Sequence, residues 1–353
     1  MKILDSMSHE GFEQIIALSD PSCGLAGYML IHDTSRGPAA GGIRLFPYQS
    51  EDFALADGFR LARAMTLKAA AADLPVGGGK IVIIDHADLV REDVLRSVGR
   101  AIQGMGGRFL AGRDVGVSVA QGAWVRDETG FMVDESEEGV GDLNIATATG
   151  VEAGARAALR LRLETDSWSG VRAAIQGAGS VGGCLATLLA KEGADLVVAD
   201  PEEKRLEALA ELVSFDVTGP EDIYSASKDV FCPCAVGGIM NIKTIERLGA
   251  RVVAGSANNV LADARMGRLL HLRGVTYVPD YLVNAGALIQ GIRYLRDGER
   301  DSREAIRGIG ERVERLLDQA HHEDVPPEAL LERQTLERLH PQRSWKDWYW
   351  PAV

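Results

Sequence analysis

The sequence predicts an α/β protein of two domains with a cleft between them, and three observations carry this prediction. At 353 residues, the chain is longer than one hydrophobic core usually covers. Its first half mixes short apolar runs with helical periodicity. From about Val171, strand-like runs alternate with helical segments, as in a parallel sheet covered by helices. We therefore expect residues 1–140 with about 325–353 to form one domain, and 141–324 the other.

The first half contains strands and at least one long helix. Apolar runs at Tyr28–His32 and Ile81–Ile84 predict strands. Apolar side chains recur on one helical face from Leu55 to Thr66, and Ser50 is placed to cap the first turn of that helix. Lys68 lies near its far end.

The second half predicts a parallel sheet followed by two helices. The predicted strands are Ala173–Gln176, Leu196–Ala199, Val230–Cys232, Val252–Ala254 and Val275–Val278. Helices are predicted at Asn284–Arg296 and Glu304–Ala320, the second ending before the breaker Asp324–Pro327, after which the chain should return to the first domain. Three of the five tryptophans fall in Trp345–Trp350, which suggests a buried tail or one in a subunit contact.

Composition excludes several classes of protein. Hydrophobic residues make up 46% of the chain, too many for a disordered protein. A net charge of -13 leaves no basic stripe for a phosphate backbone, so we expect no nucleic-acid partner. The first residues lack a signal pattern, and no stretch approaches roughly 18 apolar residues. We therefore expect a cytoplasmic protein with no membrane association.

Cysteine and histidine patterns predict no metal site. The four cysteines are too few for a disulfide framework and should be reduced. Cys232 and Cys234 should pack at a strand end rather than bind metal or carry redox chemistry. His321 and His322 point in different directions on a helix and should be solvated.

A glycine-rich motif, Gly177–Gly182, follows a predicted strand and opens a helix. Gly177 permits a tight turn, Gly179 lets the backbone approach a pyrophosphate, and Gly182 lets the helix pack on the strand. The next strand-like run ends in Asp200, about 20 positions further on, where a carboxylate binds an adenosine ribose and repels a 2'-phosphate. This context predicts a Rossmann-type domain that binds NAD, although Lys204 and Arg205 nearby also suit a 2'-phosphate.

Two lysines and one aspartate are candidates for catalysis. Small residues surround Lys68, and three glycines precede Lys80, so both amines could face one small ligand. One ammonium can bind a carboxylate while the other, its pKa lowered by burial and by its neighbour, acts as a base. Asp114 follows the strand-like Phe109–Ala111, at a strand exit. On spacing alone, solvated lysines and a surface-loop aspartate are the alternative.

Seven motifs occur in the order found in the leucine/phenylalanine/valine dehydrogenases of the glutamate dehydrogenase superfamily, which the chain resembles from about residue 9 to 330. They are Gly37–Arg44, Met65–Lys68, Gly77–Lys80, Asp114–Gly116, Pro233–Gly238, Gly255–Asn259 and Pro279–Gly286. Three features depart from the family pattern: Ile43 stands where threonine is common, Ala287 replaces a glycine, and the Asp134–Ile145 segment differs.

The resemblance implies NAD-dependent oxidative deamination of an apolar L-amino acid, and a homo-oligomer. Lys68 would bind the substrate carboxylate, Lys80 would be the general base, and Asp114 would carry protons to and from the amine. Other implied substrate-binding residues are Ala40, Gly41, Gly42, Gly112, Asn284, Leu288 and Gly291. The implied cofactor-binding residues are Gly177, Gly179, Ser180, Val181, Gly182, Asp200, Thr147, Cys234, Ala235, Ala257, Asn258 and Asn259.

Substrate preference is predicted from three small residues. The chain resembles phenylalanine-type members at Ala40 and Gly112, where leucine-type members carry larger side chains, and Gly291 replaces a branched residue. Fewer methyl groups leave room for a ring, so we expect an aromatic or bulky substrate. The alternatives are a leucine/valine-type enzyme, a superfamily member acting on another imine or oxo acid, and a non-catalytic NAD-binding protein.

Overall fold

The computed structural model describes residues 2–339, and by its internal contacts the chain forms two compact units. Of the described residues, unit 1 comprises 2–142, 290–301 and 335–339, and unit 2 comprises 143–289 and 302–334. This division differs from the predicted segments in two places, because 290–301 belongs with unit 1 and 325–334 with unit 2. The aromatic tail at Trp345–Trp350 lies outside the described residues.

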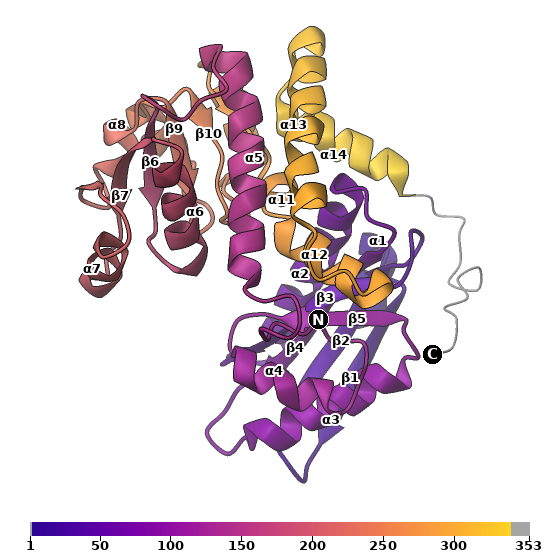
Figure 1. The fold of residues 1–353 in the computed structure, drawn as a ribbon. Helices are drawn as coiled ribbons and strands as arrows, with labels where there is room; N and C mark the ends of the chain where they lie inside the picture. The colour runs from indigo at the N-terminus through magenta and orange to yellow at the C-terminus, as the bar shows by residue number, and fades with distance from the viewer. Residues whose placement is uncertain (1, 340–353) are drawn as a thin grey trace. The chain divides into compact units, whose positions relative to one another are not determined.

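Unit 1 is built on a five-stranded mixed sheet in the order β1-β2-β4-β3-β5 (Figure 1). Its elements are α1 (Ile3–Glu10), β1 (Gln14–Asp20), β2 (Leu25–Asp33), β3 (Ala39–Phe46), α2 (Glu51–Ala71), β4 (Gly77–Ile84), α3 (Arg91–Gly104), β5 (Phe109–Arg113) and α4 (Val119–Arg126). Strands β3, β4 and β5 run parallel, whereas β1 and β2 are antiparallel to each other and β2 is antiparallel to β4. The predicted strands at Tyr28–His32 and Ile81–Ile84 are confirmed.

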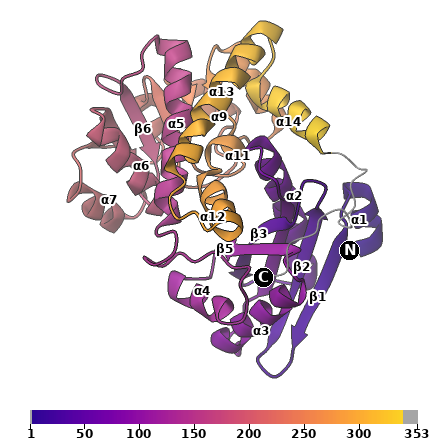
Figure 2. The same cartoon turned by 45° about the vertical axis from the view of Figure 1, so that its right-hand side comes forward.

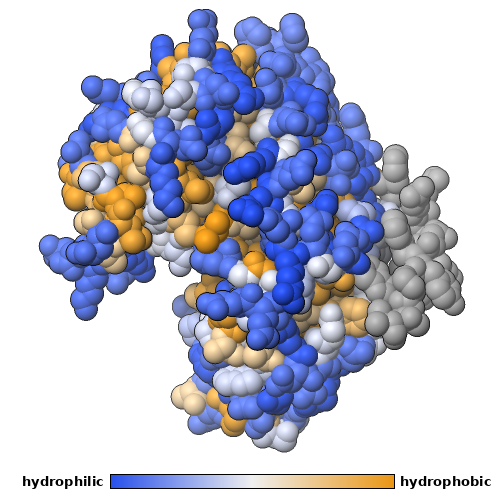
Figure 3. All heavy atoms as spheres, viewed as in Figure 1, coloured by the Kyte–Doolittle hydropathy of each residue, from blue (hydrophilic) through white to orange (hydrophobic). Residues whose placement is uncertain are grey.

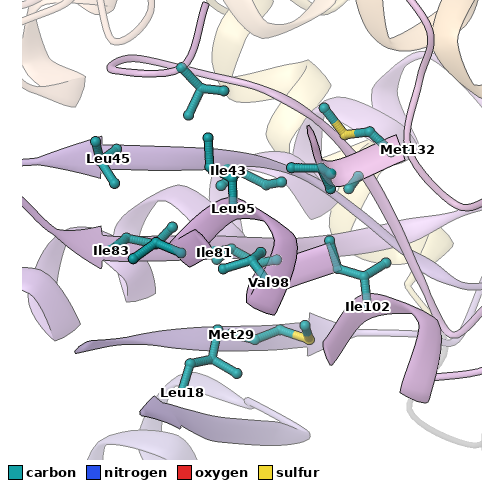
Figure 4. Packing of buried hydrophobic residues seen from close by; sticks show 14 of the residues in the cluster. Leu18, Met29, Ile43, Leu45, Ile81, Ile83, Leu95, Val98, Ile102 and Met132 are labelled. Carbon is teal, nitrogen blue, oxygen red and sulfur yellow. The ribbon is translucent and has the colours of Figure 1, made fainter. Parts of the chain in front are cut away.

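The two faces of this sheet pack against different helices (Figures 1 and 2). On one face, Ile43, Ile81 and Ile83 meet the apolar side of α3, as Figure 4 shows. On the other, Val82 meets Leu55 and neighbouring apolar residues of α2. Successive residues of a strand point to opposite faces, so Lys80 lies on the α2 face with Val82.

Helix α2 begins where the sequence predicts. The Ser50 hydroxyl accepts a hydrogen bond from the Phe53 amide, which satisfies a donor of the first turn. Further along, the helix lies so close to β4 that a side chain at Gly78 would overlap the backbone of Thr66. Gly78 therefore allows α2 and β4 to pack closely against each other. This contact lies two residues before Lys68 on α2 and two residues before Lys80 on β4.

Unit 2 is built on a six-stranded parallel sheet in the order β11-β10-β9-β6-β7-β8. Its elements are α5 (Leu143–Leu163), β6 (Arg172–Gln176), α6 (Ser180–Lys191), β7 (Asp195–Ala199), α7 (Glu203–Ala210), β8 (Asp216–Val217), α8 (Ile223–Ala226), β9 (Val230–Pro233), α9 (Ile242–Arg247), β10 (Val252–Val253), α10 (Ala264–Leu272), β11 (Thr276–Tyr277), α11 (Asp280–Val283) and α13 (Arg303–Glu323). The strand order reverses between β6 and β9, which is the doubly wound Rossmann arrangement. All five predicted strands are confirmed.

Helices at the end of the chain also follow the prediction closely. Helix α12 (Gly286–Asp297) and α13 correspond to the two predicted helices, and α13 ends at Asp324 in a left-handed cap. Helix α14 (Pro327–Arg338) starts within the predicted breaker, because proline is well suited to a first helical turn. Helix α5, which the sequence analysis did not predict, lies alongside α13 in both views (Figures 1 and 2).

Hydrophilic residues cover most of the faces seen in Figure 3, with hydrophobic patches between them. No helix within residues 2–339 is both long and apolar enough to cross a membrane. Within the same residues, no group of three His, Cys, Asp or Glu side chains could hold a metal ion. The cysteines are free, Cys232 is buried on β9, and His321 and His322 are exposed as expected.

Candidate active site

The α2 face of the unit 1 sheet carries charged side chains near the end of β5. Because strand residues alternate, Gly42 and Arg44 of β3 and Lys80 of β4 share this face. Asp114 follows β5 directly. The register of β3 with β4 and β5 brings these positions together from segments far apart in the sequence.

Lys80 and Asp114 form an ion pair. The distance from Nζ to Oδ2 is 2.7 Å, and the side chains are 6% and 24% exposed, respectively. A lysine buried to this extent needs an anionic partner, because the interior stabilises a lone ammonium poorly. Two of the three candidate catalytic residues therefore lie in direct contact.

Arg44 is a second cation on the same carboxylate. Its Nε donates to Oδ2 of Asp114 at 2.8 Å, and its Nη1 donates to Oδ2 of Asp57 at 2.9 Å. Asp57 in turn accepts hydrogen bonds from the Tyr48 hydroxyl and from Arg60, each at 2.7 Å. A continuous network therefore runs from α2 through β3 to the Lys80–Asp114 pair.

The network changes the proton affinities of the central pair. Burial favours the neutral carboxyl, but the charges and hydrogen bonds of Lys80 and Arg44 outweigh it and lower the pKa of Asp114 to about 2. Burial lowers the pKa of Lys80 below its usual value, Asp114 opposes this effect, and Arg44 adds to it. The arrangement therefore combines an ionised carboxylate with an amine that loses its proton more readily than a solvated lysine.

Small residues surround this pair. A side chain at Gly42 would come within 2.9 Å of both Lys80 Nζ and Asp114 Cβ, so a larger residue there would force this pair to shift. Gly112 pairs with Gly42 in register, and a Cβ there would meet nothing within 4 Å. Ala40 lies on the same face, two residues before Gly42. At Gly41, by contrast, the space for a side chain is filled by the Gly79 carbonyl.

Lys68 lies in the last turn of α2, the helix that covers this face, and is half-buried. Arg338 donates to the carbonyl of Ala70 at 3.1 Å, which satisfies an acceptor at the end of the same helix.

Gly291 belongs to unit 1 and packs closely, since a Cβ there would lie 3.0 Å from a Val133 methyl.

The glycine-rich turn of unit 2 has the geometry expected of a phosphate-binding turn. Gly177 has φ +101°, which favours glycine, and a side chain at Gly182 would overlap the Gly177 carbonyl. At Gly179, the residue before α6, a Cβ would meet nothing within 4 Å, so the backbone is open at the helix N-terminus. Ser180 and Val181 form the first turn of that helix. These residues fit a dinucleotide pyrophosphate.

Asp200, at the end of β7, supports this turn. Its carboxylate accepts hydrogen bonds from the amides of Ala178 and Glu202, both at 2.8 Å. Arg205 Nη1 lies 3.7 Å from the same carboxylate and is half exposed. Both the acidic residue and the cation that the sequence analysis noted therefore lie at this corner of the sheet.

The remaining predicted cofactor residues follow β9 and β10 on the same edge of the sheet. A side chain at Gly177 would lie 2.9 Å from Ala235 Cβ, which places the Cys234–Ala235 turn against the glycine-rich turn. The Ala257 amide donates to Pro233, joining the β10 turn to β9. Asn259 has φ +53°, a left-handed conformation that asparagine tolerates.

Asn284 is buried and contacts the turn after β10. Its side-chain nitrogen donates to Asn258 Oδ1 at 2.9 Å and to the Ser256 carbonyl at 3.2 Å. Its Oδ1 is buried and has no hydrogen-bond partner within residues 2–339. This oxygen is therefore able to accept a hydrogen bond from a ligand. Thr147 is also buried, and its hydroxyl donates to the Leu143 carbonyl within α5.

Comparisons with known proteins agree with this geometry. A profile of the Glu/Leu/Phe/Val dehydrogenase dimerisation domain matches residues 13–131. The chain is 38% identical to leucine dehydrogenase of Geobacillus stearothermophilus over 348 residues, which cover 98% of this chain and 95% of that protein. The chain belongs to the Glu/Leu/Phe/Val dehydrogenase family. It is an amino-acid dehydrogenase, an oxidoreductase acting on CH–NH2 donors, of a family that uses nicotinamide dinucleotides.

Other relatives act on aromatic amino acids. The dehydrogenase is 43% identical to phenylalanine dehydrogenase of Lysinibacillus sphaericus over 286 residues, 79% of this chain and 75% of that one. A crystal structure of L-tryptophan dehydrogenase from Nostoc punctiforme superimposes with a TM-score of 0.81 at 32% identity, covering 96% of this chain and 98% of that chain.

The structure brings together some of the site residues predicted for the amino-acid dehydrogenase. Within unit 1 the structure brings together Lys80, Asp114, Gly42 and Gly112. Within unit 2, the predicted cofactor residues other than Thr147 lie in the turns after β6, β7, β9 and β10 and in the first turn of α6, whereas Thr147 lies in α5. Leu288 belongs to unit 2, whereas Lys80, Asp114, Gly42 and Gly112 belong to unit 1. Sequence reasoning missed the contact between Arg44 and Asp114, although alternation along β3 places Arg44 on the face of Gly42. No pattern in the neighbouring sequence indicated that Asp57 would pair with Arg44.

Proposed function

We propose that this chain catalyses NAD-dependent oxidative deamination of an aromatic or otherwise bulky apolar L-amino acid to its 2-oxo acid and ammonia. The observation that carries the proposal is the buried Lys80–Asp114 ion pair beside Gly42 and Gly112. An amine of lowered pKa next to an ionised carboxylate provides two groups that exchange protons at different stages of one reaction.

Lys68, Lys80 and Asp114 of unit 1 each have a separate task in this proposal. The Lys68 ammonium binds the substrate carboxylate, and Asp114 takes a proton from the substrate amine. Hydride transfer from the α-carbon to a nicotinamide held by unit 2 would leave an iminium on the substrate. Lys80 then takes a proton from water as the water oxygen bonds to the iminium carbon. Asp114 then returns its proton to the nitrogen, and ammonia leaves as the hydroxyl proton passes to solvent and the carbonyl forms.

Residues of unit 2 would hold the dinucleotide. The open backbone at Gly179 and the N-terminus of α6 suit the pyrophosphate, and Asp200 suits the ribose hydroxyls of NAD. Thr147, Asn259 and Asn284 would orient the nicotinamide and the substrate. The unpartnered Oδ1 of Asn284 supports such a role.

An aromatic or otherwise bulky substrate is favoured by the open space at Gly112 and by the small Ala40 on the same face. The phenylalanine and tryptophan dehydrogenase relatives are consistent with this preference. A leucine- or valine-type substrate is the second candidate, because the leucine dehydrogenase relative aligns over 98% of the chain.

The assembly proposed is a homo-oligomer, since the matched profile describes a dimerisation domain in the family. The cytoplasmic location predicted from the sequence belongs to the same proposal. Neither property enters the catalytic argument, which rests on residues within each unit.

A panel of amino acids tests the proposed activity. The protein is incubated with NAD and phenylalanine, tryptophan, leucine or valine, and NADH absorbance gives kcat/KM for each. The highest value is expected for an aromatic substrate, and a preference for valine would refute that choice. Lys80→Ala should lower turnover by about 100-fold or more. Wild-type turnover in this variant would remove the proposed mechanism.

A further inference from the structure

The Asp114 carboxylate uses its two oxygens unequally. Oδ2 binds both Lys80 Nζ at 2.7 Å and Arg44 Nε at 2.8 Å. Within the described part of the chain, no hydrogen bond reaches Oδ1, and Asp114 remains 24% exposed. Two cations on one oxygen fix the plane of the carboxylate and leave the other oxygen able to accept a proton from outside.

Arg44 can hold this carboxylate in place because it is itself held. Its guanidinium bridges Asp114 through Nε and Asp57 through Nη1, and both side chains of the Arg44–Asp57 pair are only 19% exposed. The planar guanidinium presents its donors in fixed directions, so the position of Asp57 determines that of Asp114. Tyr48 and Arg60 complete the surroundings of Asp57.

We propose that Arg44 is a positioning residue for the reaction, holding Oδ2 of Asp114 so that Oδ1 exchanges the proton with the substrate amine. This inference rests on the proposed function. Arg44 would not touch the substrate and acts through Asp114. Lys80 retains its role as the base toward water, with its amine directed by the same Oδ2.

Arg44 also contributes its charge to the pair. It lowers the pKa of Asp114 and that of Lys80. Removing the Arg44 charge raises both pKa values. The acid limb of the pH profile of kcat/KM for deamination therefore moves to higher pH, whether Asp114 or Lys80 determines that limb. The charged and titratable groups of the network around the pair are Arg44 of β3, Tyr48 of the following loop, and Asp57 and Arg60 of α2.

Two substitutions separate the bridging geometry of Arg44 from its charge. Arg44→Met removes both the guanidinium bridge and the positive charge. It should lower kcat at least about tenfold and move the acid limb of the kcat/KM profile up by about one pH unit. Arg44→Lys keeps the charge but loses the planar bridge. Its acid limb should stay near that of the wild type, while kcat falls at least about tenfold with KM changed much less.

Arg96→Met is the matched control. Arg96 also pairs with carboxylates, but it lies on α3 against Glu92 and Asp127, on the opposite side of the unit 1 sheet from α2. Its kinetics should equal those of the wild type. Thermal melting of all three variants establishes that they are folded, and if Arg44→Met does not fold, Arg44→Lys alone decides the positioning role.

The outcomes distinguish this inference from the function on which it rests. If Asp114→Asn and Lys80→Ala lose turnover while both Arg44 variants keep the kcat and acid limb of the wild type, only the role of Arg44 is overturned. If Asp114→Asn and Lys80→Ala keep full turnover, the proposed function itself fails. Loss of kcat in Arg44→Lys with an unmoved acid limb supports positioning.

Discussion

Gly42 of β3 and Gly112 of β5 lie side by side in parallel register, one against the Lys80–Asp114 pair and the other facing open space. The two glycines therefore serve different purposes. A methyl group at Gly42 would press on Lys80 Nζ, whereas one at Gly112 would only narrow the space beside it. Substrate size can thus change at Gly112 without disturbing the charged pair.

Gly112→Ala should shift preference toward smaller substrates. One methyl group in an apolar wall alters discrimination by about 1 to 3 kcal/mol, so the ratio of kcat/KM for phenylalanine over leucine should fall about tenfold or more. The matched control is Gly130→Ala, an exposed glycine where a Cβ also meets nothing within 4 Å. An unchanged ratio in Gly112→Ala would show that this position does not line the substrate site.

Asp114→Asn should alter the pH profile in a defined direction. Asp114 raises the pKa of Lys80, so its loss lets that pKa fall further, and the acid limb of deamination moves to lower pH. Turnover on the plateau should drop by about 100-fold or more because the carboxylate that accepts the amine proton is gone. A profile of unchanged shape would contradict the coupling of the two groups. The opposite shift is expected for Arg44→Met.

Asp200→Asn should weaken discrimination against NADP. The amide retains a hydrogen-bond acceptor for the glycine-rich turn but removes the charge that repels a 2'-phosphate, and Arg205 lies close enough to attract one. The ratio of kcat/KM for NADP over NAD should rise about tenfold or more. Asp195→Asn, at the exposed start of the same strand, is the control. An unchanged ratio in Asp200→Asn would exclude the carboxylate as the discriminating group.

Glu328 should make the dehydrogenase less stable as pH rises. Burial raises its pKa to about 7 from the ordinary 4.5, and its Oε2 has no partner within residues 2–339. Between these values the unfolded chain releases the proton and the folded one keeps it. The free energy of unfolding therefore falls by up to about 3 kcal/mol across this window and is lowest above pH 7.

Glu328→Gln removes this titration. Its melting temperature should exceed that of the wild type at pH 8, and the difference should be smaller at pH 5. Glu332→Gln, an exposed change on the same helix, should show no such pH-dependent gain. Equal melting temperatures for Glu328→Gln and the wild type at pH 8 would mean that the folded protein accommodates the charge.

Much of the fold follows from local patterns. The strand-and-helix alternation after Val171 and the Ser50 cap of α2 are properties of neighbouring residues, and the structure bears them out. Helix α5 was not predicted from the sequence, because small residues such as Ala153 and Gly154, rather than large apolar ones, form much of its buried face. Its hydrophobic periodicity is correspondingly weak.

The sequence by itself determined the two-domain α/β class, the glycine-rich turn and the family resemblance, because each depends on residue types at short, fixed spacings. Only the tertiary structure decided which glycine faces open space, as at Gly112, and which faces the chain's own backbone, as at Gly41. It also decided that Arg44 and Lys80 share one oxygen of Asp114. These relationships arise from the register of β3, β4 and β5, which joins residues that are distant in sequence.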